Sequence, residues 1–448
     1  MLSPIYQTTP VCTPAFDSNL PTRIHIWYGT TQTFGTHGVA QRWINILGNV
    51  AAVEEVQSLA YSLNDGNERF LVLGPDRRRL LAPGDFNVEL EREKLELGEN
   101  CLRLILVTKA GEKEETAVKI NYQPTTSTPS YHINWQNTTL LTEVAQPVDG
   151  LWEWDENGVR PAPNQIGYDR SLAIGDLEWT NYELLVPMTL NAIDSSAFGS
   201  PISVGPGFGA ILHWPGHSDE PIQCGYIRCG WRPTGAWAWF ALDRERLELN
   251  ARPPDNTVST TEVPLTLGKT YWLRVRTTAT PLGNLYQLKA WKEGQPEPKK
   301  WQLHKQTHRL NFSQGALLLV AHHVDVTFGD IEVTPINDMP KTFMLASYLA
   351  QLPLFLLSGL VFVWSWRWGK RDRTLFLLCQ ATAILLAATG LIDIYFDMNL
   401  PVLLNQLRWE EDFVRYAVVG STALQSLLYM STFCLFGFAA YRWRHHLA

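Results

Sequence analysis

The chain has 448 residues, a formal net charge of −7 and 11% aromatic residues, with 18 Trp among them. This aromatic-rich composition excludes a disordered chain, and the acidic balance argues against a nucleic-acid binder with a broad basic face. Six Cys in so long a chain exclude a small disulfide-dense scaffold. At roughly 100–200 residues per domain, the length predicts two or three domains.

The first part of the chain predicts a tail followed by an antiparallel β-sandwich. Residues 1–22, rich in Pro, Thr and Ser, predict a flexible tail, and a similar segment at 123–130 predicts a linker. Between them, residues 23–122 alternate apolar and polar side chains with a period of two, as in a sandwich of six or seven short strands. The predicted strands are 23–28, 42–50, 56–64, 86–91, 102–108 and 116–122.

A longer β module is predicted over residues 131–336, which carry most of the Trp. Short apolar runs recur there with no helical pattern, and about two hundred residues of such runs predict a large two-sheet jelly roll. The predicted strands are 171–176, 182–190, 210–214, 236–242, 246–250, 270–278, 285–292, 315–323 and 326–336.

Residues 341–448 predict three membrane-spanning helices, at about 343–364, 374–392 and 416–441, because these runs contain no charged residue. A helix needs about 20 apolar residues to cross the hydrocarbon core, and only a helix satisfies its own backbone there. The alternative is three buried core helices of a soluble protein, which uncharged runs of this length disfavour.

The basic residues beside these helices predict their orientation. Arg367, Lys370 and Arg371 follow the first run, and Arg442 and Arg444 follow the third. Because positive residues stay in the cytoplasm, the first loop and the C-terminus are predicted to be cytoplasmic and residues 1–340 extracytoplasmic. Such a topology needs a signal peptide, which the segment MLSPIYQTTPVCTPAF does not resemble. We therefore expect a further segment upstream.

One stretch of the first module resembles a known family. LELGENCLRLILVTKAGEKEETAVKINY, residues 95–122, is similar to the closing hairpin of bacterial immunoglobulin-like and cadherin-like repeats. The resemblance implies an immunoglobulin-like sandwich. Lys109 and Ala110 occupy the turn where cadherins have Asp, so their calcium binding is not carried over.

Three stretches of the second module resemble the concanavalin A-like, laminin G-like superfamily. They are YDRSLAIGDLEWTNYELLVPMTL (168–190), PLTLGKTYWLRVRTT with LYQLKAWKEGQPEP (264–278 and 285–298), and VTFGDIEVTPI (326–336). The resemblance implies a jelly roll of a kind that serves in lectins, glycan hydrolases and adhesion modules. Function then depends on the site and not on the fold.

Aromatic residues around one apparent loop are the candidate ligand-binding residues. Sugars bind by laying their C–H faces on aromatic rings while polar groups take the hydroxyls. The candidates are Trp214, His217, Trp231, Arg232 and Trp237. For Trp237, which lies on a predicted strand, a core role is the favoured interpretation.

Two His and two Cys lie in the same region, with the spacing H-x3-H-x6-C-x4-C. His213, His217, Cys224 and Cys229 suit zinc by type, but their spacing is that of no common zinc motif. A Cys224–Cys229 disulfide is favoured, since an extracytoplasmic compartment is oxidising. Free thiols are the remaining alternative. No metal and no cofactor are expected.

A catalytic site was sought in the run Glu153-Trp154-Asp155-Glu156. Concanavalin-like glycosidases place their carboxylates on alternate residues of one strand, so that all face the same way. Here the third carboxylate, Glu156, comes one residue too early and points to the other face of the strand. A solvated edge strand is therefore the favoured interpretation, and a non-catalytic protein is expected.

Polar residues within the third hydrophobic run predict a contact between helices. Ser421, Thr422, Gln425 and Ser426 lie about one helical turn apart and predict a stripe that docks on another membrane protein. Hydrogen bonding within the bundle, as also expected for Gln380, is the favoured interpretation, and docking is the alternative.

Together these patterns predict a mainly β protein anchored in the bacterial inner membrane by three helices. We expect it to bind a glycan or another surface ligand through the jelly roll. One alternative is a non-catalytic accessory subunit of a larger membrane complex, and a second is a glycan-cleaving enzyme. The expected partners are a glycan or surface protein, the lipid bilayer and other membrane-protein subunits, but no nucleic acid.

Overall fold

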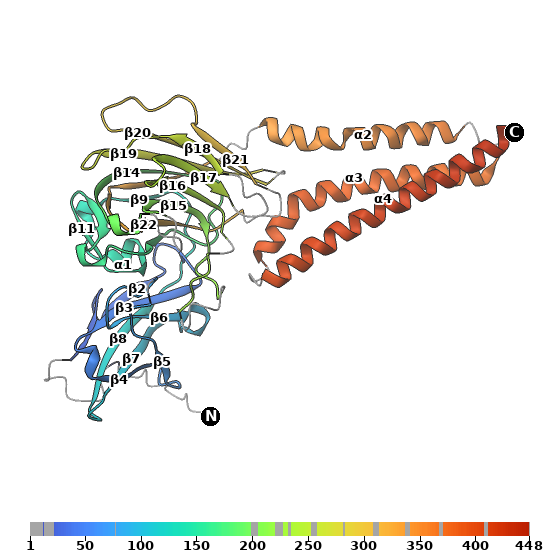
Figure 1. Ribbon diagram of the computed structural model, residues 1–448. Coiled ribbons are helices and arrows are strands. Elements are labelled where there is room, and N and C mark those ends of the chain that lie inside the picture. Colours follow the sequence, from blue (N-terminus) through green and yellow to red (C-terminus); the bar gives the residue numbers. More distant parts are fainter. Residues whose placement is uncertain are drawn as a thin grey trace, which may run out of the picture. The chain divides into compact units, whose positions relative to one another are not determined.

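The computed structural model shows a mainly β chain (Figure 1). It describes residues 12, 22–76, 78–198, 205–219, 227–231, 234–251, 258–280, 283–307, 313–336, 341–366, 371–406 and 411–447, without the side chains of 341–351, 393–425 and 445–447. The chain divides into two compact units. The first comprises Met1–Thr277, Tyr286–Lys305 and Gln314–Ile336, and the second comprises Thr278–Leu285, Gln306–Ser313 and Asn337–Ala448.

The first unit begins with a small two-sheet sandwich. Its three-stranded sheet has the order β1 (Ile24–Ile26), β3 (Trp43–Val50) and β6 (Asp85–Glu91). Its five-stranded sheet has the order β2 (Thr31–Phe34), β8 (Lys113–Tyr122), β7 (Gly98–Thr108), β4 (Val56–Leu63) and β5 (Arg69–Leu71). Six of these strands overlap the predicted period-two runs, because alternate residues such as Leu102, Leu104 and Leu106 are fully buried between the sheets, whereas β2 and β5 were not predicted.

A disulfide that the sequence analysis did not anticipate ties the N-terminal region to this sandwich. Cys12 is bonded to Cys101 on β7, with their Cα atoms 5.2 Å apart. A bond across 89 residues of sequence restricts the unfolded chain strongly and so stabilises the fold.

The rest of the first unit is a larger two-sheet sandwich, as the strand pattern predicted. Its seven-stranded sheet has the order β10 (Gln146–Asp149), β13 (Arg170–Ile174), β22 (Ala316–His322), β15 (Gly207–Trp214), β16 (Ala236–Ala241), β17 (Arg246–Ala251) and β18 (Val258–Glu262). Its nine-stranded sheet has the main order β11 (Trp152–Asp155), β12 (Gly158–Pro161), β23 (Val324–Phe328), β14 (Tyr182–Ile193), β19 (Thr270–Thr280), β20 (Gly283–Lys292) and β21 (Leu303–Gln306), with β24 (Ile331–Pro335) pairing both β14 and β9 (Tyr131–Ile133). A single helical turn, α1 (Leu141–Val144), precedes β10.

The main core lies between these two sheets. On β14, Leu184, Val186 and Met188 point inward and are at most 1% exposed, whereas Pro187 and Thr189 point outward. Burying each large apolar side chain contributes roughly 1.5–3 kcal/mol. Period-two alternation therefore leaves each sheet with one outer face, and these two outer faces are the surfaces on which a ligand could bind.

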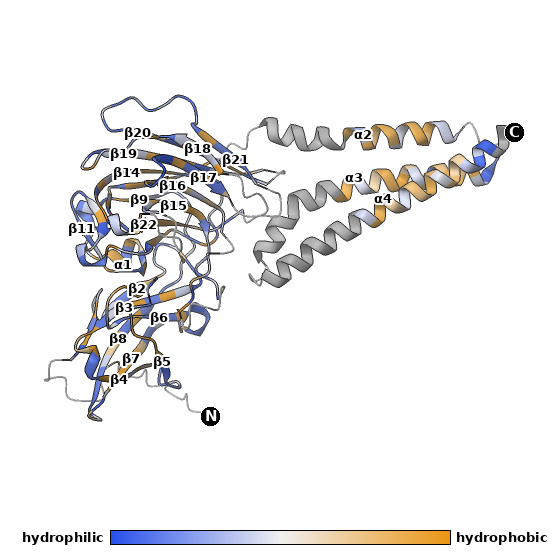
Figure 2. Ribbon diagram, in the orientation of Figure 1, coloured by the Kyte–Doolittle hydropathy of each residue, from blue (hydrophilic) through white to orange (hydrophobic). Residues whose placement is uncertain are grey.

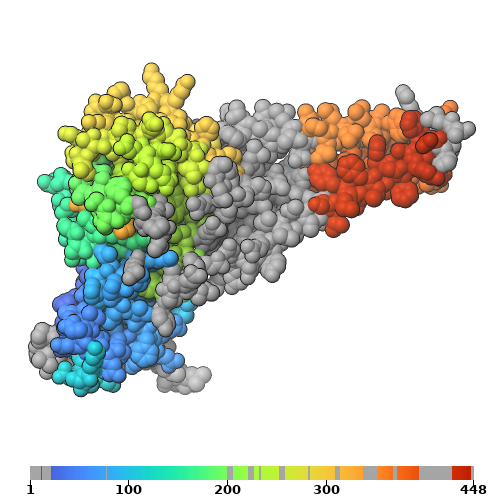
Figure 3. Space-filling model, viewed as in Figure 1, coloured from blue at the N-terminus to red at the C-terminus, as the bar shows by residue number. Residues whose placement is uncertain are grey.

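The two sandwiches are joined by hydrogen bonds and not only by the linker. The Tyr28 hydroxyl of the small sandwich donates to the carbonyl of Gly150 at 3.0 Å and accepts from the amide of Trp152 at 2.9 Å. Burial raises the pKa of Tyr28 above its usual value. The Trp43 indole donates to the carbonyl of His217 at 2.8 Å. In Figure 3 the small sandwich, in blue, packs directly on the larger one. The first module is therefore part of one β unit.

The second unit contains three long helices, α2 (Lys341–Ser365), α3 (Arg373–Gln406) and α4 (Glu411–Leu447). Among the described residues, Arg373–Ile392 is long and apolar enough to cross a membrane, and Leu352–Ser365 is a shorter apolar stretch. The described residues in the middle of these helices are mostly hydrophobic (Figure 2). Large side chains such as Leu360, Val363 and Phe433 are 68%, 70% and 74% exposed.

Two details of these helices bear on the predictions. α3 continues through Asp393 and Asp397 to Gln406, beyond the predicted end at 392, because Asp is a weaker helix former but not a helix breaker. The Gln380 side chain donates to the hydroxyl of Ser365 on α2 at 2.5 Å, which confirms the expected hydrogen bonding within the bundle.

Candidate functional site

The outer face of the seven-stranded sheet is closed. Ile211, Leu318 and Val320 point away from the main core, yet each is 0% exposed. The segment around His217 and Trp231 packs over them together with the small sandwich. A face covered in this way offers no room for a large ligand.

Most of the sequence-predicted ligand-binding residues lie together on this face. The ring centroids of Trp214 and His217 are 5.5 Å apart, those of His217 and Trp231 are 4.5 Å apart, and those of Trp231 and Trp237 are 5.2 Å apart. Trp214 is 0% and His217 2% exposed, while Trp231 and Trp237 are half-buried. Arg232 lies outside the described residues. Trp214 and His217 are therefore buried by the residues around them, and their contact with a ligand stays a prediction.

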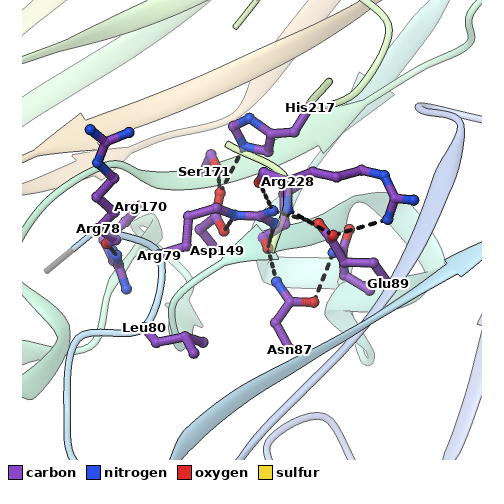
Figure 4. A network of polar contacts seen from close by, with 12 residues as sticks. Arg78, Arg79, Leu80, Asn87, Glu89, Asp149, Arg170, Ser171, His217 and Arg228 are labelled. Atoms are coloured by element: carbon purple, nitrogen blue, oxygen red, sulfur yellow. Dashed lines mark hydrogen bonds and ion pairs between the residues drawn. The ribbon is translucent and has the colours of Figure 1, made fainter. Parts of the chain in front are cut away.

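A buried charged network holds His217 in place (Figure 4). Its Nε2 lies 3.2 Å from the carboxylate of Asp149, which also accepts from the Ser171 hydroxyl at 2.6 Å and forms an ion pair with Arg79 of the small sandwich. Burial alone would raise the pKa of Asp149, but the charge of Arg79 and the hydrogen bond from His217 outweigh it and hold that pKa well below its usual range.

The same network links Arg79 to the loop that covers the sheet. Arg79 pairs with Glu89 at 2.5 Å and donates to the carbonyl of Arg228. The guanidinium of Arg228 in turn pairs with Glu89 at 3.2 Å and lies 3.6 Å from the ring centre of Trp43. Buried charges are tolerated only when they are paired and hydrogen-bonded, and these are. These ion pairs and hydrogen bonds hold the covering loop on this face of the sheet.

The predicted metal and disulfide residues divide between two places. His213 lies in the core, where its Nδ1 is 2.9 Å from the hydroxyl of Tyr286. Cys229 is disulfide-bonded, but Cys224 lies outside the described residues, so their pairing stays a prediction. No group of three metal-ligating side chains occurs among the residues that the structure describes.

The outer face of the nine-stranded sheet is open and carries a cavity of about 900 Å³. Five neighbouring strands, β11, β12, β23, β14 and β19, form its floor and walls. The lining combines aromatic, hydroxyl, amide and carboxylate side chains. It comprises Glu153, Trp154, Asp155, Asn157, Gly158, Arg160, Pro187, Thr189, Asn191, Thr270, Trp272, Glu293, Thr327 and Gly329.

Strand register explains why the surface is hollow at this place. Asp155 pairs with Gly158 at one end and Pro187 pairs with Trp272 at the other. Between them the amide of Gly329 donates to the carbonyl of Pro187 at 2.8 Å. A side chain at Gly158 would lie 2.2 Å from a backbone oxygen, so only glycine fits there. Gly158, Gly329 and Pro187 therefore leave a trough. It runs between the carboxylate of Asp155 and the ring of Trp272.

A parallel row of hydroxyl groups lines the trough. Thr327 pairs with Thr189, which pairs with Thr270, and the hydroxyls of the last two lie 2.9 Å apart. The Asn191 amide donates to Thr327 at 2.9 Å and to Asp325 at 3.1 Å. These groups can donate and accept further hydrogen bonds from an incoming hydroxyl.

One wall of the cavity is aromatic. The Trp272 ring stacks on Trp291 of β20, with the ring centres 6.3 Å apart and an interplanar angle of 12°. Both rings are half-buried, so the pair is rigid and still presents a face to solvent. Such a surface suits the apolar face of a sugar ring.

The opposite wall is acidic. Glu153 and Asp155 are exposed on the edge strand β11 and line the cavity, and Glu156 follows in the turn. Glu293, after β20, stands at the aromatic end, where its amide donates to the carbonyl of Thr270 at 2.9 Å. The run in which we sought catalytic carboxylates is thus a wall of this cavity, on a strand edge as expected.

The predicted polar stripe lies on α4. Ser426 is exposed, while the side chains of Ser421, Thr422 and Gln425 lie outside the described residues. Docking on another membrane protein through this stripe therefore stays a prediction.

Sequence reasoning missed the open cavity as a site. Trp272 was available from the alternation of TYWLRVRTT, which turns Trp272 away from the core residues Leu273 and Val275. The missing information was the long-range register that places Trp272 four strands from Asp155.

Comparisons with known proteins find no family model and no curated protein that matches the chain. Solved structures similar to part of it include a legume lectin-like domain from Entamoeba histolytica, with 10% identity, a TM-score of 0.31, and coverage of 44% of this chain and 92% of that one. The exoplasmic/lumenal domain of VIP36, in a Ca2+/Man3GlcNAc-bound form, has 8% identity, a TM-score of 0.30, and coverage of 44% and 86%. A Caenorhabditis elegans galectin has 11% identity, a TM-score of 0.23, and coverage of 35% and 83%. At these scores we base no argument on the similarity.

Proposed function

We propose that this chain is a membrane-anchored, non-catalytic surface protein that binds a glycan in the cavity on the outer face of the nine-stranded sheet. The observation that carries the proposal is the trough itself, in which Trp272 and the carboxylate of Asp155 stand at opposite ends of a floor of Gly and Pro, with a row of Thr hydroxyls beside that floor. Aromatic walls with a few convergent polar groups are typical of sugar sites.

The size of the trough supports an oligosaccharide as the ligand. Four strand spacings of about 4.8 Å separate β19 from β11, which makes the site about 19 Å across. The strands themselves hold the side chains that line it, so the site is pre-formed and a ligand need order little on binding.

Two observations support an anchored protein whose β unit lies outside the cytoplasm. The described parts of α2–α4 expose many large apolar side chains, which suit lipid better than water. The β unit contains the Cys12–Cys101 disulfide, whereas Cys379 and Cys434 on the helices are free. Disulfides persist in oxidising compartments.

Binding of the full chain, purified in mild detergent, to a glycan array tests the proposal. We expect at least one oligosaccharide to bind, and Trp272→Ala to weaken that binding by about tenfold, because the stacking surface is lost. Trp231→Ala, on the closed face of the other sheet, is the matched control and should leave binding unchanged. Loss of binding in Trp231→Ala alone would move the site to the residues first predicted from the sequence. An array with no binder would contradict the proposal.

Labelling of intact cells with a membrane-impermeant maleimide tests the topology. After mild reduction, Cys12 and Cys101 should react from outside in a Cys379→Ser, Cys434→Ser background. Reaction only after the cells are opened would place the β unit in the cytoplasm and contradict the anchored-surface part of the proposal.

A further inference from the structure

We infer that the glycan bound in this cavity carries a protonated amine, as an amino sugar without its acetyl group does. This inference rests on the proposed function and adds the chemical class of the ligand. It comes from the distribution of charge around the aromatic trough, in which carboxylates stand at both ends.

The carboxylates that line the cavity lack cationic partners. Glu153 and Glu293 form neither a hydrogen bond through their side chains nor an ion pair within the described part of the chain, and Asp155 accepts only the amide of Asn157, at 2.8 Å. All three carboxylates are exposed to solvent in the cavity. Their charge is therefore available to a ligand.

Three basic residues on the neighbouring strands β19 and β20 are paired with protein carboxylates. Arg274 and Arg276 both pair with Glu183, at 2.5 and 2.6 Å. Lys289 pairs with Glu297 at 2.6 Å. These groups therefore add no unpaired positive charge beside the cavity.

The one basic side chain that lines the cavity is also paired. Arg160 lies 3.3 Å from the carboxylate of Asp325. With Glu153, Asp155 and Glu293 unpaired, the lining as described has a negative surplus. An anionic glycan would meet repulsion here, and a cationic one would meet attraction.

The aromatic wall recognises the same kind of group. A cation over the face of a Trp ring is attracted by the ring quadrupole, most strongly when it is partly desolvated. Trp272 and Glu293 both line the aromatic end of the cavity, joined through the backbone contact between Glu293 and Thr270. An ammonium group there would contact an aromatic face and a carboxylate together.

A pair of oligosaccharides that differ only in acetylation tests the inference. Calorimetry on the full chain in detergent would compare an oligomer of glucosamine, an oligomer of N-acetylglucosamine and an oligomer of a uronic acid. We expect the glucosamine oligomer to bind about tenfold more tightly than its acetylated form, with a preference that falls as salt is added, and the uronic acid oligomer to bind least.

Charge-removing variants locate the effect. The double variant Glu153→Gln, Asp155→Asn and the single variant Glu293→Gln should each reduce the preference for the glucosamine oligomer several-fold. Glu332→Gln is the matched control, since Glu332 is exposed on β24 of the same sheet but does not line the cavity. Control and parent chain should show the same preference.

The outcomes separate this inference from the proposed function. Equal binding of the acetylated and free oligomers, or a preference that survives in the acidic variants, overturns the inference and leaves glycan binding standing. Absence of binding to every oligosaccharide overturns both.

Discussion

The two outer faces of the large sandwich differ in that one is covered by other parts of the β unit and the other is open. On the seven-stranded sheet, apolar residues such as Leu318 and Val320 are fully covered, and the covering segments are held by the buried charges of Arg79 and Asp149. On the nine-stranded sheet, Trp272 and a row of Thr residues remain open over a cavity of about 900 Å³. One face thus serves stability and the other is free to bind.

The difference shows that aromatic residues alone do not identify a binding face. The closed face has more closely packed aromatic rings than the open one, and its rings contact one another and His217. What marks the open face is the combination of an aromatic wall with small residues that leave a trough, and with carboxylates that form no ion pair within the described part of the chain.

Replacing Arg79 should have the largest effect, a loss of stability, because it removes the cation that the buried carboxylates of the closed face share. Arg79→Met leaves Asp149 and Glu89 buried without their shared partner, and breaking such a pair costs about 3–5 kcal/mol. Denaturant unfolding of the purified chain, followed by Trp fluorescence, measures the loss. Arg92→Met is the control, since Arg92 forms an exposed ion pair with Glu93 and its loss should cost under about 1 kcal/mol. Equal losses in the two variants would contradict the network's role.

Placing a large side chain on the open face should have the next largest effect. This effect should be on ligand affinity and not on stability. Thr189 lies half-buried in the middle of the trough, and Thr189→Tyr would place a large ring where a ligand lies. We expect the affinity for any glycan that the parent chain binds to fall about a hundredfold, which corresponds to about 2.7 kcal/mol. The unfolding midpoint should change little, because the substitution is on an outer face. Unchanged affinity would show that the ligand binds elsewhere.

Most of the fold followed from local pattern. Alternation in runs such as VQSLAYSLN predicted β4, and it did so because one side of each strand is buried in a core. The predicted strand 326–336 was wrong in one respect, because it is divided into β23 (Val324–Phe328) and β24 (Ile331–Pro335). The uncharged runs predicted α2–α4, although the end of α3 did not follow, because Asp393 ends the uncharged run without ending the helix.

The site could be predicted only in part, since it depends on contacts distant in sequence. The sequence indicated that Trp231 and Trp237 cluster near His217, and they do, but it held no sign that Arg79 would reach this cluster from another module. Burial of a residue such as Trp214 depends on what packs over its sheet. No local pattern contains that information.

Replacing one Asn side chain on each face should give a smaller loss of stability, and the two losses can be compared. Asn87 is buried at the closed face, where it donates to the carbonyl of Val148 at 3.1 Å and accepts from the side-chain amide of Asn45 at 2.9 Å. Asn87→Ala removes the acceptor of the buried Asn45 amide and should cost about 1–3 kcal/mol. Asn191 is exposed on the open face, and Asn191→Ala should cost about 0.5 kcal/mol or less. Denaturant unfolding of both variants measures the difference. A larger loss for Asn191→Ala would reverse the assignment of the two faces.

The titration of Asp149 should have the smallest effect at neutral pH, because it changes the free energy of unfolding only in acid. Arg79 and His217 lower the pKa of Asp149 in the folded chain despite its burial, so ionised Asp149 stabilises the fold above the unfolded value of about 3.9. This contribution is lost as the pH falls from there toward the lower folded value, at up to about 1.4 kcal/mol per pH unit. Unfolding free energies measured from neutral to acidic pH should therefore fall less steeply below about pH 4 in Asp149→Asn than in the parent chain. Arg79→Met should flatten the same limb, since it removes the charge that lowers the pKa of Asp149. Parallel curves for all three chains would mean that the carboxylate of Asp149 titrates alike in the folded and unfolded states, and that the closed face does not depend on its charge.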